Sequence, residues 1–266
     1  MSHLPPYSVI IPAYNAVTYL AEAVANVRSQ PHPPAEIIIV DDGSTDGTAA
    51  LAQSLGPGIR YFHQANQGPA AARNLGISHA RHDILAFIDA DDLWPDNKIG
   101  RQLGYLVAHP ELEMVLGLQQ TFQHVSDPAD PAAPRRPRFD PPSFIYLVGC
   151  GIYRRSVFDR VGLFDVSLRY GEDTDWFFRS WEQDTPMHML FEPMLHYRIH
   201  AGGMTHGRDV VQKGYLRVLK KSIDRRRLQG GAVGTVGVRA FPWLFKQTTP
   251  EQLAAILAQN ALSPKP

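Results

Sequence analysis

The sequence holds one cysteine, Cys150, in 266 residues, which excludes a fold built on disulfides and a zinc site made of several cysteines. We interpret Cys150 as a small buried residue, because its neighbours are apolar or glycine. No apolar run approaches the roughly 20 residues that span a bilayer. The N-terminal residues also lack the basic and apolar regions of a secretory signal peptide. These absences predict a soluble, cytoplasmic protein.

Net charge is absent as well, since 26 Lys and Arg residues balance 26 Asp and Glu residues. This balance argues against a protein that binds nucleic acid by bulk electrostatics. The sequence has no Gly-x-Gly-x-x-Gly after its first predicted strand and no Gly-x-x-x-x-Gly-Lys-Ser/Thr. A dinucleotide-binding dehydrogenase and a P-loop NTPase are therefore disfavoured. Without such a loop, a bound diphosphate would need a metal ion and basic side chains to neutralise it.

The first half of the sequence alternates short apolar runs with helical patterns. The runs predicted as strands are Ser8–Pro12, Glu36–Val40, Ile59–Phe62 and Ile84–Ile88. Three helices are predicted in this half. The first is capped by Asn15 and has apolar positions at Val17, Leu20, Val24 and Val27. The second ends near Leu55, and the third spans Gly68–His79. This alternation predicts an α/β fold with a doubly wound, mainly parallel sheet flanked by helices. Ligands of such sheets bind beyond the carboxyl ends of the strands.

The second half is less regular. Extended structure is predicted for Met114–Phe122, Phe144–Tyr153 and Met187–Phe191, and helices for Asp173–Trp181 and Asp209–Leu228. Residues 126–142 hold six prolines without periodicity. They predict a flexible loop or lid, with a plain solvated connector as the alternative.

An Asp-x-Asp pair, Asp89 and Asp91, follows the fourth predicted strand, and Asp92 adds a third carboxylate. Residues two apart in extended backbone project to one face, so both carboxylates can converge on one ligand. Paired carboxylates suit Mg²⁺ or Mn²⁺, which are commonly shared with phosphate oxygens. The alternative is that these acids cap the helix that starts near Pro95. Three adjacent negative charges favour the metal, because a cation would offset them.

A second acidic pair, Asp41 and Asp42, ends the second predicted strand. The Asp42 carboxylate could accept hydrogen bonds from a nucleobase imide or a ribose. An Asx-type turn with Gly43 is the alternative, and this motif alone does not decide between them.

Together these residues resemble the family 2 inverting glycosyltransferases, which have the GT-A fold. Six segments carry the resemblance in the family's order, within residues 6–206: Ser8–Asn15, Ile37–Thr48, Asn66–Gly76, Phe87–Asp92, Gly171–Trp176 and Tyr197–His200. The sequence departs from the pattern at Gly202–Thr205, where members often have a serine-containing turn.

The resemblance implies a nucleotide-sugar site at the strand ends. Asp42 matches the aspartate that reads uracil, and Arg73 matches an arginine near the base and ribose. Asp91 would bind a Mn²⁺ or Mg²⁺ ion bridging two phosphates, and His200 could coordinate the same metal or touch the diphosphate. The nucleotide-binding residues expected from the resemblance are Pro12, Ala13, Tyr14, Asp42, Arg73, Asp89, Ala90, Asp91 and Arg198.

Asp173 matches the family's general base, with Glu172 as the competing candidate. The base would take a proton from an acceptor hydroxyl as that oxygen attacks the anomeric carbon opposite the leaving group. One displacement inverts the anomeric configuration. From the residues alone, two acids there would equally indicate the first turn of a helix.

The resemblance predicts a glycosyltransferase domain over residues 1–206. Residues 1–110 would bind the nucleotide-sugar, and residues 111–206 would form a smaller acceptor-side and catalytic half. Residues 207–266 would be a helical C-terminal extension, in which 209–228 form a basic amphipathic helix. Such a helix could lie on an anionic inner membrane surface near a lipid-linked glycan acceptor, or pack on the domain with a solvated basic face.

The sequence therefore predicts a metal-assisted inverting glycosyltransferase that uses a UDP-sugar, in bacterial-type glycan or polysaccharide synthesis. A sugar-nucleotide nucleotidyltransferase is disfavoured, because Pro12–Asn15 is not a Gly-rich basic loop. The main alternative is a catalytically silent nucleotide- or glycan-binding module of the same fold. A membrane-surface interaction protein is a further alternative.

Overall fold

The computed structural model describes residues 4–126, 135–203 and 208–228. Within these ranges, eight strands form one sheet in the order β3-β2-β1-β4-β7-β5-β6, with β8 paired to β5. The strands are β1 (Ser8–Ala13), β2 (Glu36–Asp41), β3 (Ile59–His63), β4 (Ile84–Phe87), β5 (Met114–Val125), β6 (Arg136–Phe139), β7 (Ile152–Arg154) and β8 (Met187–Arg198).

The N-terminal half of the sheet is parallel. Strands β3, β2, β1 and β4 all run in one direction, and β1, β2 and β4 are buried along their whole length. This confirms the predicted parallel core with β-branched, fully buried strands. The other half is mixed, because β7 pairs antiparallel with β4 and with β5, whereas β8 runs parallel to β5.

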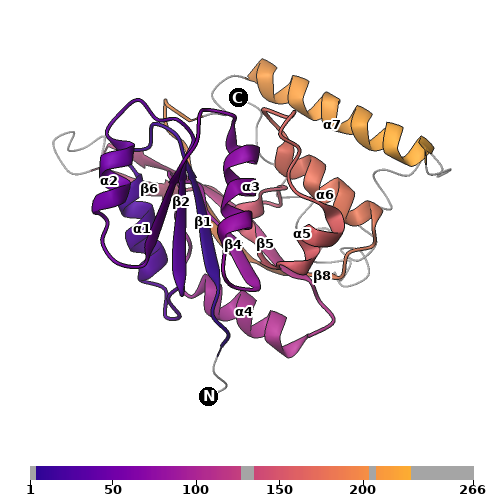
Figure 1. Ribbon diagram of the computed structural model, residues 1–266, viewed down its shortest axis with the longest axis horizontal. Coiled ribbons are helices and arrows are strands. Elements are labelled where there is room, and N and C mark those ends of the chain that lie inside the picture. Colours follow the sequence, from indigo (N-terminus) through magenta and orange to yellow (C-terminus); the bar gives the residue numbers. More distant parts are fainter. Residues whose placement is uncertain (1–3, 127–134, 204–207, 229–266) are drawn as a thin grey trace.

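Helices cover both faces of the sheet (Figure 1). On one face, α1 (Leu20–Arg28), α2 (Thr48–Ser54) and α4 (Lys98–Ala108) pack in one apolar core. On the other, α3 (Pro69–His79), α5 (Ser156–Val161) and α6 (Glu172–Glu182) pack in a second. Alternate residues of one strand feed the two cores, since Val9 and Ile11 of β1 face the first and Ile10 faces the second.

Helix α3 packs unusually close to β1 at Gly76. A Cβ atom added to this glycine would lie 2.4 Å from Cγ2 of Ile10, a buried side chain in the middle of β1. Only a residue without a side chain permits that approach. The close contact fixes α3, and with it Arg73, against the centre of the sheet.

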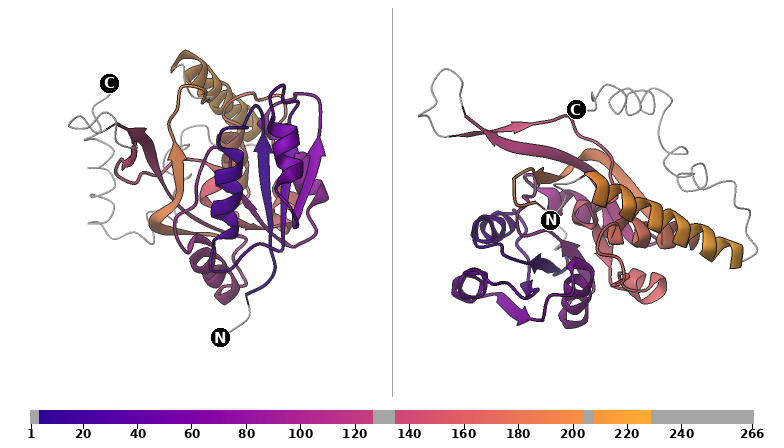
Figure 2. Two further views of the ribbon diagram at one scale, coloured as in Figure 1. Left: turned by 90° about the vertical axis from the view of Figure 1, so that its left-hand side faces the viewer. Right: turned by 90° about the horizontal axis from the view of Figure 1, so that it is seen from above.

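Two predictions for the second half are corrected. Residues Phe144–Tyr153 do not form a strand; the apolar run is a loop with a single 3₁₀ turn, Val148–Cys150, and only Ile152–Arg154 is extended. Part of the proline-rich segment 126–142 is also a strand rather than a loop, because β6 pairs with the outer end of β5. This hairpin projects from the body of the protein (Figure 2). Residues 127–134 lie outside the described residues.

The helix predicted after Asn15 begins later than expected. Asn15 has a positive φ of 48° and does not cap a helix, because α1 starts only at Leu20. The Asn15 side chain instead accepts a hydrogen bond from the N–H of Thr45, 2.8 Å away. The predicted apolar face is buried at Leu20, Val24 and Val27, whereas Val17 is exposed.

The predicted basic helix is present as α7 (Arg208–Leu228), and it lies alongside α6 (Figure 1). Its buried Val218 packs with Leu168 and Phe178. Packing on the domain is therefore confirmed for this helix. The rest of the predicted extension, residues 229–266, lies outside the described residues. Within the described chain, no helix combines the length and apolar character needed to cross a membrane.

Candidate active site

Three aspartates follow β4, and they point in different directions. The side chains of Asp89 and Asp91 are 37% and 34% exposed, so both can reach a ligand. Asp92 is buried and accepts the backbone N–H of Arg198 at 2.8 Å. Burial raises the pKa of Asp92 well above its usual range, and the charges of Asp91 and Asp89 raise it further. Asp92 therefore anchors β8 to this loop, while the other two carboxylates remain available.

The two predicted metal ligands lie side by side. The Nε2 atom of His200 is 2.9 Å from Oδ2 of Asp91, although the residues are 109 positions apart in the sequence. Burial and the charge of Asp89 raise the pKa of the Asp91 carboxyl, and the hydrogen bond with His200 lowers it. His200 stands at the end of β8 with its ring 4.7 Å from that of Tyr19.

Arg198 is buried beneath this pair. Its guanidinium lies 4.7 Å from the centroids of the Tyr19 and Phe122 rings, and its Nε donates to the carbonyl oxygen of Asp91 at 2.6 Å. Its Nη2 donates to Glu22 at 2.7 Å. These contacts fix the backbone of Asp91. The predicted contact of Arg198 with phosphate oxygens stays a prediction.

A second cluster forms around Arg73, which is 4% exposed and joins three carboxylates. Its Nη2 donates to Oδ1 of Asp89 at 2.7 Å, and its Nη1 donates to Glu172 at 2.8 Å and to Asp173 at 3.1 Å. The Nε atom of Arg73 is buried and has no partner among the described residues. One cation thus connects the Asp-x-Asp loop to both candidate bases.

Asp173 lies in the first turn of α6, after Gly171 with a positive φ of 78°. Its Oδ2 accepts the N–H of Val148 at 2.9 Å, and its Oδ1 faces Arg73. Burial raises the pKa of the Asp173 carboxyl to about 7, with the charge of Glu172 adding to the rise and that of Arg73 opposing it. A carboxylate whose pKa lies near the working pH is suited to general-base catalysis.

The predicted nucleotide-binding segments meet at the carboxyl ends of β1 and β2. Ala13 pairs with Asp41 across the two strands, and the side chain of the following Tyr14 is 53% exposed. Asp42 is buried and accepts the backbone N–H groups of Gln67 and Gly68 at 2.9 and 2.8 Å. Asp42 thus orders the loop that leads into α3. Its predicted contact with uracil stays a prediction, as do the contacts of Pro12, Ala13 and Ala90.

The tertiary structure therefore brings the predicted residues into two adjoining groups. Asp91, His200 and Arg198 form one, Arg73, Glu172 and Asp173 form the other, and Asp89 stands between them. The sequence did not indicate Glu22 or the N–H of Val148. Glu22 stands in the middle of a helix pattern, and a backbone N–H carries no sequence signal.

The donor set near Asp91 fits a hard divalent cation. A carboxylate oxygen and an imidazole nitrogen converge there, and both are suitable for Mn²⁺, with phosphate oxygens completing its coordination. Within the ranges that the structure describes, no group of three or more His, Cys, Asp or Glu side chains is placed to hold a metal by itself. A metal bound here would therefore depend on ligands from the diphosphate.

The chain is similar in sequence to a known family and to several named glycosyltransferases. The profile described as "Glycosyl transferase family 2" matches residues 8–162. An uncharacterized glycosyltransferase of Rickettsia felis is 47% identical over 106 residues, which is 39% of this chain and 18% of the relative. The uncharacterized glycosyltransferase RT0329 of Rickettsia typhi is 29% identical over 77% of this chain and 67% of its own length. TuaG of Bacillus subtilis, named for teichuronic acid biosynthesis, is 40% identical over 39% of this chain and 42% of its own length.

Two solved structures share the fold. The mannosyltransferase PcManGT of Pyrobaculum calidifontis, in complex with GDP-Man and Mn²⁺, has a TM-score of 0.66 and 19% identity, and the match covers 100% of this chain and 77% of that one. Residues 1–349 of S. aureus TarS in complex with UDP-GlcNAc give a TM-score of 0.63 and 18% identity over 82% of this chain and 66% of that one.

The fold and these matches define a glycosyltransferase of the GT-A class. The chain belongs to Glycosyl transferase family 2, because the family profile covers more than half of it. It spans 18% of the R. felis relative, so the activity of that longer protein does not transfer to it.

Proposed function

We propose that the protein transfers a sugar from a UDP-sugar to an acceptor hydroxyl with inversion, assisted by Mn²⁺ or Mg²⁺. The observation that carries this proposal is the position of Asp173. Its buried carboxyl lies beside Arg73, which in turn binds Asp89, two residues before the candidate metal ligand Asp91. A candidate base and a candidate diphosphate site are thus joined through one side chain.

The reaction follows from these positions. A carboxylate oxygen of Asp173 takes the proton of the acceptor hydroxyl while that oxygen forms a bond to the anomeric carbon. The bond from this carbon to the diphosphate oxygen breaks on the opposite face, and UDP leaves with the bonding electrons. Asp91 and His200 would hold the cation, which when bound neutralises the charge of the departing diphosphate. Arg73 keeps the Asp173 carboxylate oriented and limits how far burial raises its pKa.

The choice of UDP rests on the resemblance at Asp42. The two structural relatives do not decide it, because one is a complex with UDP-GlcNAc and the other with GDP-Man. We therefore propose titration calorimetry with UDP, GDP, CDP and dTDP, each with and without Mn²⁺. Binding of UDP that depends on Mn²⁺ would support the proposal, and a preference for GDP would overturn the donor assignment.

Turnover separates an enzyme from a catalytically silent binding module. Release of UDP from a panel of UDP-sugars, with water or a glycan as acceptor, is expected for the wild type and lost in Asp173→Asn. Glu172→Gln tests the competing base and is expected to retain more activity. Tight UDP binding without turnover of any UDP-sugar would favour the silent module instead.

We propose a glycan, free or lipid-linked, as the acceptor, with the protein acting in bacterial polysaccharide synthesis. The name of TuaG supports this class of product. A peripheral contact of 209–228 with the inner membrane surface stays a proposal, which exposed Arg217 and Arg227 support. Co-sedimentation with vesicles containing anionic lipid tests it, and binding lost in a variant with these two residues changed to Gln would support it. Equal sedimentation of that variant and the wild type, or none of either, would overturn it.

A further inference from the structure

Helix α6 has two faces with different partners. Glu172 and Asp173 face Arg73 of α3, whereas Asp175 is bound from α7. Residues two apart in a helix are separated by roughly 200° around the axis, so the face that carries Asp173 and the face that carries Asp175 are nearly opposite. The candidate base therefore sits in a turn that is held from both sides.

Arg225 of α7 bridges the two ends of α6 along this second face. Its Nη1 donates to Oδ1 of Asp175 at 2.8 Å, and its Nε donates to Oε2 of Glu182 at 2.8 Å. Asp175 and Glu182 are seven residues apart, or about two helical turns. Burial favours the neutral form of Arg225, but Glu182 and Asp175 outweigh it and raise its pKa. Arg225 is therefore a cation that connects the first turn of α6, at Asp175, to its last residue, Glu182.

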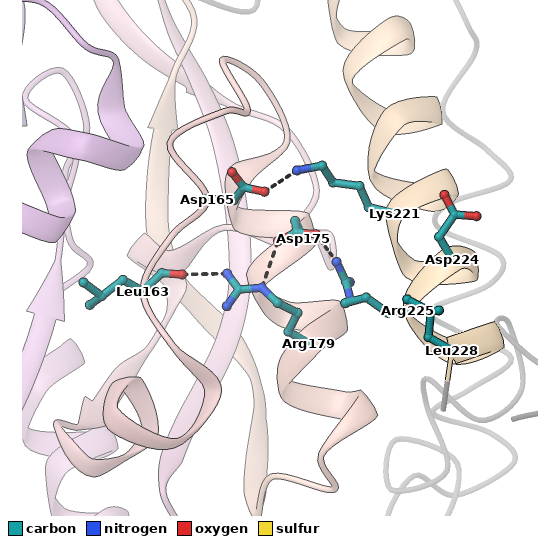
Figure 3. A pocket seen from close by; sticks show the side chains of 8 residues that line it. All are labelled: Leu163, Asp165, Asp175, Arg179, Lys221, Asp224, Arg225 and Leu228. Carbon is teal, nitrogen blue, oxygen red and sulfur yellow. Dashed lines mark hydrogen bonds and ion pairs between the residues drawn. The ribbon is translucent and has the colours of Figure 1, made fainter. Parts of the chain in front are cut away.

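Asp175 is held between two arginines. It is 1% exposed, its Oδ1 binds Arg225, and its Oδ2 accepts the Nε of Arg179 at 2.9 Å. Figure 3 shows Asp175 between the two arginines, with Arg179 also donating to the carbonyl oxygen of Leu163 at 2.8 Å. Ion pairs of buried groups with fixed geometry resist displacement far more than exposed pairs do.

Further contacts hold α7 in place around Arg225. Ser222 donates to Glu182 at 2.6 Å, and Lys221 pairs with Asp165 in the loop before α6. Asp165, Lys221 and Arg225 border a cavity of about 510 Å³ between this loop, α6 and α7 (Figure 3). Its carboxylates and cations are paired with one another or with neighbouring side chains, which is typical of a seam between packed elements.

From this geometry we infer that Arg225 is a positioning residue for Asp173. It holds the first turn of α6 from behind through Asp175, and so keeps the Asp173 carboxylate between Arg73 and the N–H of Val148. The inference rests on the proposed role of Asp173 as the base. It also gives α7 a function in catalysis, although none of the α7 side chains that the structure describes contacts Asp173.

The first test is a double-mutant cycle with Arg225→Gln and Asp175→Asn, measured as release of UDP from whichever UDP-sugar of the panel the wild type turns over. Because small displacements of a catalytic group can cost about 10- to 100-fold in rate, each variant is expected to lower kcat by that range. The KM for the donor should stay unchanged, since Arg225 and Asp175 pair with each other, Glu182 and Arg179 and with neither Asp91 nor Asp42 in the described structure. The double variant should be no slower than the slower single variant, and Arg225→Lys should recover part of the rate.

Lys220→Gln is the matched control, because this lysine of α7 is 81% exposed and, among the residues that the structure describes, pairs only with Asp224. It should behave as the wild type. An unchanged kcat in Arg225→Gln would overturn the inference. A loss of rate no larger than the fraction of unfolded protein in the sample would also overturn it. Additive effects of the two substitutions on kcat in the double variant would overturn it too.

A second measurement keeps this inference separate from the proposed function. Amide hydrogen exchange of residues 171–178 reports the rigidity of the first turns of α6 whether or not the protein turns over a UDP-sugar. Faster exchange there in Arg225→Gln, with Lys220→Gln unchanged, is expected. Equal exchange in all three proteins would overturn the inference even if the wild type is active.

Discussion

The Nη1 atom of Arg73 lies 3.1 Å from Oδ1 of Asp173, although 100 residues separate them in the sequence. The same guanidinium binds Asp89, so the candidate base and the Asp-x-Asp loop share one cation. We predict that Arg73→Gln raises the pKa of Asp173 further, because it removes the charge that opposes the effect of burial. The activity of this variant should therefore require a higher pH than that of the wild type.

Arg73→Gln should also lower the free energy of unfolding. Breaking a buried ion pair from one side costs about 3–5 kcal/mol, since it leaves charges without a partner. Arg73→Lys keeps the charge and should lose less stability and less activity. Chemical denaturation and pH–rate profiles of the three proteins check both expectations. Identical pH profiles for wild type and Arg73→Gln would show that Arg73 does not act on the base.

The wild type itself should respond to pH near neutrality. Its Asp173 carboxyl has a pKa of about 7, and it must be ionised to accept a proton. We expect kcat to fall about tenfold for each pH unit below that value and to level off above it. Among the described residues, the titratable and charged groups that interact electrostatically with Asp173 are Arg73, Glu172, Asp89, Cys150 and Tyr153. A kcat that stays constant between pH 5.5 and 8 would exclude this carboxyl as the base.

Stability should change with pH in the opposite direction. A carboxyl whose pKa is higher in the folded than in the unfolded state binds more protons when folded, so its contribution to stability is present at low pH. That contribution is lost as the pH rises from about 4, the unfolded value, toward 7. Denaturation of wild type and Asp173→Asn at pH 5 and pH 8 isolates the effect. The wild type should lose more stability between the two than the variant does.

Binding of nucleotide should depend on the pair Asp91 and His200. We expect Asp91→Asn and His200→Ala each to weaken Mn²⁺-dependent binding of UDP by 10-fold or more, because a weakly held cation loses one of its two protein ligands. Binding measured without metal should change little. Asp96→Asn, an exposed residue in the same loop, is the control. Equal affinities for wild type and Asp91→Asn in Mn²⁺ would remove the metal assignment.

The close approach of α3 to β1 gives a prediction about stability. Gly76→Ala places a methyl group against Ile10, and overpacking of this kind typically costs 1–3 kcal/mol. Gly104→Ala in α4 is the matched control, because no atom beyond the neighbouring backbone of α4 itself lies within 4 Å of the added Cβ, and alanine favours helix by roughly 0.5–1 kcal/mol. Thermal unfolding should therefore shift down for Gly76→Ala and up for Gly104→Ala. A shift of the same sign in both would contradict the packing argument.

The pattern of apolar residues correctly predicted the strands of the first half. The four runs predicted as strands in the first half became β1–β4. Three of them are buried along their whole length, which agrees with the continuous apolar character of buried parallel strands. The apolar run Phe144–Tyr153 was wrongly predicted as a strand. An added Cβ would lie 3.2 Å from Leu195 at Gly149 and 2.4 Å from the Tyr153 hydroxyl at Gly151, so these glycines let the run pack closely in a 3₁₀ turn. The N–H of Val148 in this turn is donated to Asp173 instead of to a neighbouring strand.

In the candidate active site, too, short motifs predicted some features and missed others. The motifs that carry the family resemblance predicted that Asp91 binds a metal, that His200 could coordinate it or touch the diphosphate, and that Asp173 or Glu172 is the base. They did not predict that Arg73 would bind Glu172, Asp173 and Asp89 at once, nor that Arg198 would be buried between two aromatic rings. The pairings of Arg73 with Glu172 and Asp173 join residues about 100 positions apart, and sequence spacing holds no information about them.

By itself, the sequence determined the parallel core, the strand ends that carry polar residues and the family of the protein. These features are local, since they depend on side-chain periodicity and on motifs a few residues long. Only the tertiary structure decided which carboxylate each arginine neutralises and how α7 contacts α6 through Arg225 and Asp175. The physical reason is that the charge, burial and orientation of a group depend on neighbours that folding brings from distant parts of the chain.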